Sequence, residues 1–175
     1  QMGCSAFDMS WERRYEQNGS IHVCDSSAKY IPLHLQFDSI YADMTQCSLT
    51  PLFHLWRQAD GMAAALVESP VCLCVHLDRT CQDADGRFRQ SACKVQVDDF
   101  CLVPKFIDEK LRTEMIEYQI IALTAHLGED RAGHYPSALR IAPSLPFQTR
   151  PAEWLLTEDW QRPSPVWHLP NWLRR

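Results

Sequence analysis

The 175-residue sequence predicts an α+β fold in which an antiparallel sheet dominates. Short apolar runs, several of them with two-residue alternation, recur along the chain, and turn residues bound most of them. A small segment with helical spacing precedes most of these runs. Hydrophobic residues make up 46% of the chain and charged residues 22%, which is typical of a globular protein.

The N-terminal part is expected to begin with irregular backbone over residues 1–29, apart from a short strand at Ile21–Cys24. Trp11 with the arginines that follow it would either anchor a partner or simply lie on the surface. Residues 30–37 alternate between apolar and polar side chains, which predicts a half-buried strand. Pro32 places that strand at a sheet edge, or marks its first residues.

The middle of the chain is expected to hold a helix and several strands. Thr50 followed by Pro51 is typical of a helix start, so we expect a helix over residues 51–60. Residues 71–77 are largely apolar on both faces, which favours a central strand. Two further short strands are predicted at 93–97 and at 100–103, the second closed by Pro104.

A histidine stands at the mouth of a predicted loop near the C-terminal end. An apolar run over 117–127 ends at a glycine, five residues of loop chemistry follow, and His134 then opens a second apolar run, 134–141. A further strand is predicted at 153–157, and two carboxylates end it. If the strands 134–141 and 153–157 pair as a hairpin, His134 lies beside these carboxylates, Glu158 or Asp159.

A carboxylate beside an imidazole fixes its tautomer and raises its basicity, which equips a histidine as a general base. The alternative is a surface histidine near a solvated acid pair, because such pairs are common on protein surfaces. The residues alone leave these two interpretations open for His134.

Charge and segment composition exclude some classes of function. The formal net charge is -5, and no basic block stands out, so nucleic acid is not an expected partner. No apolar segment approaches the roughly 20 residues that cross a bilayer, so no membrane association is expected. The first residues lack the basic and apolar regions of a secretory signal, which favours an intracellular location in cytoplasm or nucleus.

Cysteine usage predicts thiols rather than a disulfide framework, because the chain is long enough to build a core and shows no secretory signal. Cys72, Cys74 and His76 share one face of the predicted strand 71–77. These three side chains could bind a metal. We favour the alternative, a buried strand in which the two cysteines pack as small apolar residues. No Cys-x-x-Cys pair is present, and neither a metal nor another cofactor is predicted. The eight cysteines are Cys4, Cys24, Cys47, Cys72, Cys74, Cys81, Cys93 and Cys101.

Three motifs together carry a family resemblance. They are Tyr118-x-Ile-x-Ala-x-x-x-His126-x-Gly128, then Gly133-His134-Tyr135, then Trp154-x-x-x-Glu158-Asp159. The sequence resembles the His box of the ubiquitin-specific proteases in these motifs. Upstream, residues 70–79 are similar to the family's palm strand. The resemblance covers about residues 30–167, with an N-terminal segment, 1–29, and a tail, 168–175, on either side.

The resemblance implies a papain-like cysteine protease fold that hydrolyses the peptide or isopeptide bond at a ubiquitin C-terminus. Ubiquitin or a ubiquitin-like protein would be the partner. By its position His134 would be the general base. The family has Asp or Asn four residues after the Trp, where this chain has Glu158, so Glu158 and Asp159 are joint candidates for the third member of the triad.

The resemblance also implies substrate-binding residues around the base. Gly133 precedes His134 in a loop where a missing side chain allows close approach of a ligand. His126 would line the cleft just before the loop, and Tyr135 would pack beneath the site.

The nucleophile is the main departure from the family. The family's Cys box, Asn-x-Gly-Asn-Thr-Cys-Tyr, has no match, and Cys4 is the only cysteine near the N-terminus. A histidine without a thiolate has nothing to activate. We therefore expect the C-terminal half of a protease domain without its nucleophile, or a non-catalytic ubiquitin-binding scaffold. An unrelated cysteine hydrolase with the same geometry is a third alternative.

Overall fold

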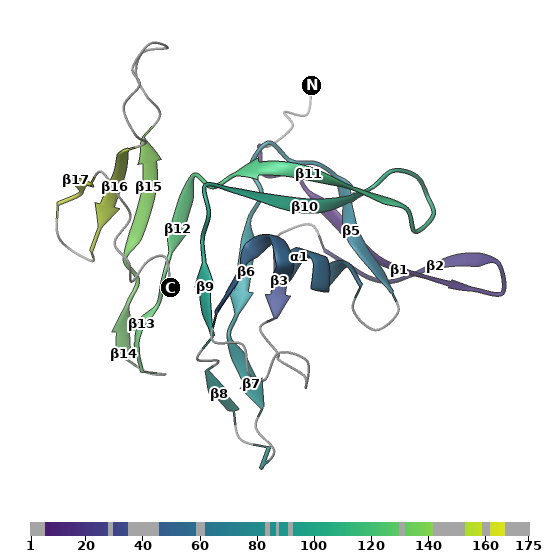
Figure 1. Cartoon of the computed structure of the whole chain (residues 1–175), viewed down its shortest axis with the longest axis horizontal. Coiled ribbons are helices and arrows are strands. Elements are labelled where there is room, and N and C mark those ends of the chain that lie inside the picture. Colours follow the sequence, from purple (N-terminus) through teal and green to yellow (C-terminus); the bar gives the residue numbers. More distant parts are fainter. Residues whose placement is uncertain are drawn as a thin grey trace, which may run out of the picture. The chain divides into compact units, whose positions relative to one another are not determined.

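The computed structural model describes residues 6–27, 30–34, 46–58, 62–82, 85–86, 88–90, 93–129, 132–141, 153–158 and 162–166. This part of the chain is mostly β with one short helix, which confirms the predicted α+β class (Figure 1). The chain divides into two compact units, residues 1–118 and 119–175. None of the helical structure within the described ranges is long and apolar enough to cross a membrane.

A five-stranded sheet with the strand order β11-β10-β5-β1-β2 dominates the first unit (Figure 1). β1 pairs antiparallel with β2 and with β5, whereas β5 and β10 pair in parallel. The strands are β1 (Ser10–Gln17), β2 (Ser20–Ser27), β5 (Ala63–Glu68), β10 (Phe100–Phe106) and β11 (Thr113–Gln119).

The short strand predicted at Ile21–Cys24 is confirmed within β2. The prediction of irregular backbone is wrong for the rest of residues 10–27, which form the β1–β2 hairpin. The turn of this hairpin is Asn18-Gly19, and both residues have positive φ, 53° and 75°. Positive φ at both central residues matches the right-handed twist of the flanking strands, and Asn-Gly is the dipeptide that adopts it most readily.

Three two-stranded pairs complete the first unit. β3 (Ile31–His34) pairs in parallel with β6 (Val75–Asp78), and β4 (Gln46–Ser48) pairs in parallel with β9 (Lys94–Gln96). β7 (Thr80–Gln82) pairs antiparallel with β8 (Phe88–Gln90). Within the described residues β6 has only β3 as its neighbour, so the predicted central strand at 71–77 is wrong. Val71 is 84% exposed, in a bend before the strand begins.

The helix α1 (Leu49–Arg57) begins two residues before its predicted start. Ser48 occupies the N-cap position, and the Thr50 hydroxyl instead accepts a hydrogen bond from the Leu102 backbone N–H, at 3.1 Å. The helix ends at Arg57 rather than at residue 60. The side chains that α1 buries are those of Leu49, Leu52, Phe53 and Trp56.

Trp11 belongs to the core of the first unit. It is 2% exposed, packs edge-to-face against Trp56 at 5.5 Å between ring centroids, and donates its indole N–H to the Tyr30 carbonyl at 2.9 Å. The interpretation of Trp11 as an exposed partner anchor is therefore wrong.

Trp11→Phe is expected to lower the free energy of unfolding by about 1–2 kcal/mol, because it removes the part-buried hydrogen bond to the Tyr30 carbonyl and part of a packed ring. Urea unfolding followed by far-UV circular dichroism measures this change. Val23→Ala, at a 53% exposed strand position, is the control and is expected to change the midpoint much less. Equal midpoints for wild type and Trp11→Phe would contradict the assignment.

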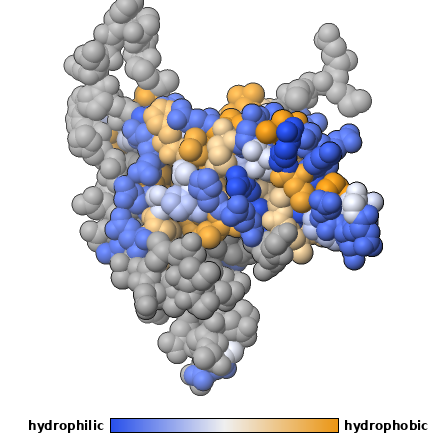
Figure 2. Space-filling model, turned by 45° about the vertical axis from the view of Figure 1, so that its right-hand side comes forward, coloured by the Kyte–Doolittle hydropathy of each residue, from blue (hydrophilic) through white to orange (hydrophobic). Residues whose placement is uncertain are grey.

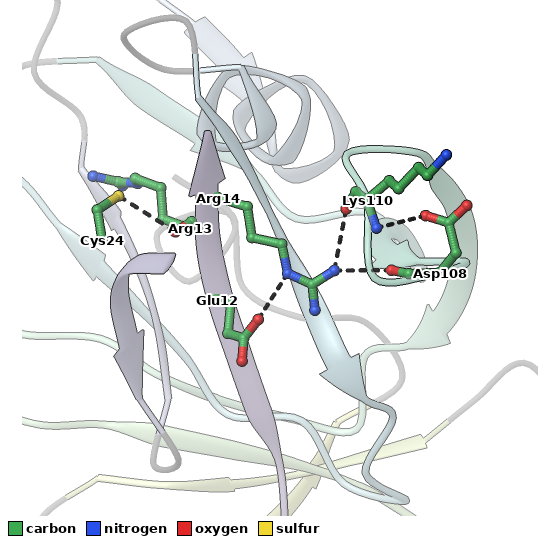
Figure 3. Close-up of polar contacts among 6 residues, drawn as sticks. All are labelled: Glu12, Arg13, Arg14, Cys24, Asp108 and Lys110. Atoms are coloured by element: carbon green, nitrogen blue, oxygen red, sulfur yellow. Dashed lines mark hydrogen bonds and ion pairs between the residues drawn. The ribbon is translucent and has the colours of Figure 1, made fainter. Parts of the chain in front are cut away.

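Arg14 is buried in the same sheet and ties β1 to the turn between β10 and β11 (Figure 3). Its Nε lies 2.7 Å from a Glu12 carboxylate oxygen, and its Nη1 donates to the carbonyls of Asp108 and Lys110, at 2.8 and 3.1 Å. Its guanidinium carbon lies 3.9 Å from the centre of the Phe106 ring. A charged residue in the core is thus paired and hydrogen-bonded, as burial of a charge requires.

The second unit holds a four-stranded antiparallel sheet with the order β12-β15-β16-β17. Its strands are β12 (Ala122–Thr124), β15 (Ser137–Ile141), β16 (Glu153–Thr157) and β17 (Ser164–Val166), and a separate hairpin joins β13 (Leu127–Glu129) to β14 (Ala132–His134). One face of the sheet buries Ala138, Trp154 and Leu156, with Ile120, Leu123, Ala125 and Val166 packed against them.

The strand predicted at 153–157 is confirmed as β16, and its predicted pairing with the preceding strand is confirmed over residues 137–141. The sequence predicted one strand at 117–127 and one at 134–141. In the structure the first of these ranges is divided among β11, β12 and β13, and the second is divided between β14 and β15.

Candidate functional site

His134 lies at the open end of the β13–β14 hairpin, where it is exposed and pairs with Leu127 across the ladder. The next pairs are Gly128 with Gly133 and then Glu129 with Ala132. The predicted five-residue loop at 129–133 is therefore shorter, since the ladder continues on both sides almost to its tip. The two glycines oppose each other and leave a stretch of hairpin without side chains.

His126 and Tyr135 stack on each other at this open end. Their ring centroids are 4.7 Å apart with 24° between the planes, and both residues are exposed, Tyr135 at 63%. The Ala125 N–H donates to the Pro136 carbonyl at 3.0 Å in the same register that pairs β12 with β15 and β13 with β14. One continuous register from residue 122 to residue 139 thus sets the two rings opposite each other.

Strand alternation separates the predicted site residues into two faces. Successive side chains of an extended strand point to opposite sides. His134 therefore shares its side with Pro136 and Ala138, both buried, whereas Tyr135 shares its side with His126. The sequence indicated each of these residues but not the stacked pair, which only the cross-strand register reveals.

Glu158 follows β16 directly and is exposed. The last pair of the β15–β16 ladder is Ser137 with Thr157. One further step in the same register would set Glu158 opposite Pro136, and residues opposite each other lie on the same face of a sheet. We therefore expect Glu158 on the side of the sheet that His134 shares with Pro136. Asp159, the other predicted acid, lies outside the described residues.

Side-chain contacts hold this end of the sheet in register. The hydroxyls of Thr124 and Ser137 lie 2.9 Å apart, and the Thr157 hydroxyl donates to the Ser137 carbonyl at 3.3 Å. Ser137 thereby contacts both neighbouring strands at the last pair of the β15–β16 ladder, directly before Glu158.

An apolar surface extends the side of the sheet that carries the stacked pair. Leu139 is 52% exposed and pairs with Ala122 and Leu155, while Ile141 is 38% exposed two residues further along the strand. On the face drawn in Figure 2, apolar groups are interspersed with polar ones. The surface from Tyr135 to Ile141 is of the kind that contacts protein partners.

No cysteine occurs in residues 119–175, so the second unit has no thiol for His134 to activate. The nearest cysteine in sequence is Cys101, which is 4% exposed, and burial raises the pKa of its thiol to about 11. A buried protonated thiol is a poor nucleophile. Cys4, the weak nucleophile candidate from the sequence, lies outside the described residues.

Cys72, Cys74 and His76 do not lie in one strand, because only His76 belongs to β6. Cys72 and Cys74 precede β6, Cys74 is exposed, and His76 contacts the Tyr30 ring edge-to-face at 5.6 Å. The interpretation of these cysteines as part of a buried strand is therefore wrong. No group of three or more metal-binding side chains is found within the described ranges.

The sequence and the β architecture of this chain are similar to those of known proteins. No family model matches the chain. Over 74 residues, 42% of this chain, the sequence is 34% identical to Ubiquitin carboxyl-terminal hydrolase 1 of Arabidopsis thaliana, and the match spans 7% of that protein.

Solved structures of the SAGA DUB module match almost the whole chain. The module of Ubp8, Sgf11, Sus1 and Sgf73 bound to ubiquitin aldehyde gives a TM-score of 0.66 at 15% identity, covering 96% of this chain and 39% of the other. A variant module bound to monoubiquitin gives 0.63 at 14%, covering 96% and 38%. A yeast SAGA DUB module with a variant Sgf73 gives 0.64 at 16%, covering 96% and 36%.

The chain is therefore similar to the ubiquitin-specific proteases, and the resemblance to that family is confirmed. Its fold matches part of the Ubp8 fold, as the resemblance implied. The chain spans well under half of the structures it matches and 7% of the curated relative.

Proposed function

We propose that this chain contributes the His-box part of a cysteine-type deubiquitinase, which hydrolyses the peptide or isopeptide bond at a ubiquitin C-terminus. The observation that carries the proposal is the placement of His134 at the open end of a hairpin. The register of the adjoining β15–β16 ladder, continued by one residue, supports Glu158 on the same side. The fold shared with the ubiquitin-bound SAGA modules supports ubiquitin as the substrate.

In the proposed reaction a cysteine from outside residues 119–175 is the nucleophile. His134 takes the proton of that thiol, and the thiolate attacks the carbonyl carbon of the scissile bond. His134 then gives the proton to the departing amine, which leaves a thioester. Water hydrolyses the thioester with His134 again acting as base, so that ubiquitin and the free thiol are regenerated.

Glu158 and Asp159 stay joint candidates for the group that orients His134, and the strand register favours Glu158. The expected result is that Glu158→Gln lowers the kcat of the parent enzyme more than Asp159→Asn does. Steady-state kinetics on a ubiquitin C-terminal fluorogenic substrate measure the difference. A larger loss with Asp159→Asn would transfer the role to that residue.

Gly133, Tyr135 and His126 are proposed to contact the substrate. The side-chain-free pair of Gly128 and Gly133 permits close approach of another backbone. The stacked rings present a rigid aromatic surface continuous with Leu139, and aromatic residues dominate binding energy at protein interfaces. Ubiquitin is thereby expected to contact both sides of the hairpin.

A non-catalytic ubiquitin-binding scaffold is the second candidate. Two observations favour it. The second unit contains no cysteine, and Glu158 stands at a position where the family has Asp or Asn. Backbone chemical-shift changes on titration with ubiquitin would show binding. Binding without turnover by the intact parent protein would establish the scaffold, whereas turnover by the parent would exclude it. An intracellular location stays a prediction for both candidates.

The 175-residue chain by itself is expected to bind ubiquitin without cleaving a ubiquitin C-terminal fluorogenic substrate, because no thiol accompanies His134 in its unit. Fluorescence release at micromolar chain concentration measures turnover. Cleavage that Cys4→Ala abolishes would contradict this prediction and would make Cys4 the nucleophile. Cys24→Ala, at an exposed position in β2, is the matched control for that substitution.

A further inference from the structure

Two cysteine side chains meet inside the first unit. The Sγ atoms of Cys47 and Cys93 are 3.6 Å apart, although the residues are 46 positions apart in sequence. Cys47 is 8% exposed and Cys93 is 4% exposed. Cys47 lies in β4 and Cys93 directly precedes β9, and these strands pair in parallel, so backbone pairing holds the two thiols side by side.

We propose that Cys47 and Cys93 are a redox pair that a hydroperoxide converts reversibly into a disulfide. One thiol reacts with the peroxide, whose O–O bond breaks, and gives a sulfenic acid and one water. The second sulfur attacks the sulfenic sulfur, the S–S bond forms, and a second water leaves. Two thiols and one hydrogen peroxide thus give one disulfide and two waters, and an added dithiol such as dithiothreitol reverses the change.

The backbone around the pair favours this bond. An S–S bond is about 2 Å long, so the two sulfurs need to approach by about 1.5 Å. The Arg79 side chain donates to the Cys93 carbonyl at 2.7 Å, which holds the backbone before β9 in place. The sulfurs are therefore expected to approach by rotation of the two cysteine side chains.

The environment of the pair sets its reactivity. Burial, with the neighbouring Cys93 thiol, raises the pKa of Cys47 to about 12. Thiolate is the reactive form, so the Cys47 thiol is expected to react with peroxide slowly at neutral pH and faster as the pH rises. This behaviour is opposite to that of a low-pKa catalytic cysteine.

Oxidation would close a loop that contains α1 and the strands β5 to β8. Cross-linking residues this far apart restricts the unfolded chain, so the folded state gains stability. For a chain of this size the melting temperature is expected to rise by roughly 5–10 °C. The bond would leave the second unit's sequence unlinked, because that unit contains no cysteine.

Peptide mapping of the whole chain tests the proposal without any substitution. The chain is treated with hydrogen peroxide, remaining thiols are blocked with N-ethylmaleimide under denaturing conditions, and tryptic peptides are analysed by mass spectrometry. The expected product joins residues 30–57 to residues 90–94, two hydrogens lighter than the separate peptides; each of them contains one cysteine. Dithiothreitol added before blocking is expected to remove it.

Matched variants complete the test. Cys47→Ser and Cys93→Ser are each expected to abolish the linked peptide and the rise in melting temperature. Cys74→Ser, which removes an exposed thiol of the same unit, is expected to leave both. The proposal is overturned if, after peroxide treatment, Cys47 and Cys93 are both still free thiols that N-ethylmaleimide labels. It is also overturned if either is found linked mainly to a different cysteine.

Discussion

His134→Ala in the intact parent enzyme is expected to lower kcat by about 10²- to 10⁴-fold, the range that a positioned general base contributes. The substitution removes the only group at the open end of the β13–β14 hairpin for which we propose proton transfer. Steady-state hydrolysis of a ubiquitin C-terminal fluorogenic substrate measures the change. His54→Ala, at an exposed position on α1, is the matched control and is expected to retain the full rate.

A binding measurement separates a base from a residue that only supports the fold. His134→Ala is expected to keep the wild-type affinity for ubiquitin, because a proton-transfer group acts in the transition state rather than in substrate binding. Loss of kcat with unchanged affinity and an unchanged melting temperature would support the base. A parent enzyme that keeps its full rate after His134→Ala would refute the assignment.

Arg14→Met is expected to lower the free energy of unfolding by about 3–5 kcal/mol, the usual cost when one partner of a buried ion pair is removed. The substitution keeps a long apolar side chain near Phe106 but leaves Glu12 and the carbonyls of Asp108 and Lys110 without their donor. Urea unfolding at neutral pH measures the loss.

A second arginine at the same turn provides the comparison. Arg112 pairs with Asp108 at 3.0 Å, but its side chain is 71% exposed. Hydrogen bonds from the Lys110 N–H and from Arg112 hold the pKa of the Asp108 carboxyl below its usual value. Solvent screens an exposed pair of this kind, so it contributes little to stability. Arg112→Met is therefore expected to cost far less than Arg14→Met. Similar losses for the two variants would show that Arg14 is not a buried anchor.

Local sequence signals predicted the second unit well. The alternation of residues 134–141 and 153–157 predicted that the two strands pair, and they pair over residues 137–141 and 153–157. The arrangement of His134 and Glu158 stays a prediction. The sequence could not predict that His134 lies on one side of the hairpin and Tyr135 on the other side with His126. This assignment depends on the register that continues through Ala125 and Pro136 between the two short ladders. The family resemblance indicated His126 and Tyr135 as site residues but did not predict that their rings stack on each other.

The errors in the first unit have identifiable causes. The strand β1 contains Glu12 and Arg14, and their charges concealed a buried strand, although Asn18-Gly19 is a strong hairpin signal. The helix start was misplaced because the Thr50 hydroxyl bonds to a distant strand instead of capping the helix. The error in the helix start concerns a tertiary contact between residues far apart in sequence, which a local pattern does not contain. The hairpin error is local, because the Asn18-Gly19 signal was available in the sequence.

The continuous register between residues 122 and 139 makes the chemistry of this region sensitive to chain length. Adding or deleting a single residue between Tyr135 and Ser137 would exchange the two faces of the hairpin relative to the packed sheet. His134 would then leave the side of Glu158, and an aromatic ring would take its place. We therefore expect natural relatives of this chain to vary in length at the hairpin tip rather than between the histidine and the sheet.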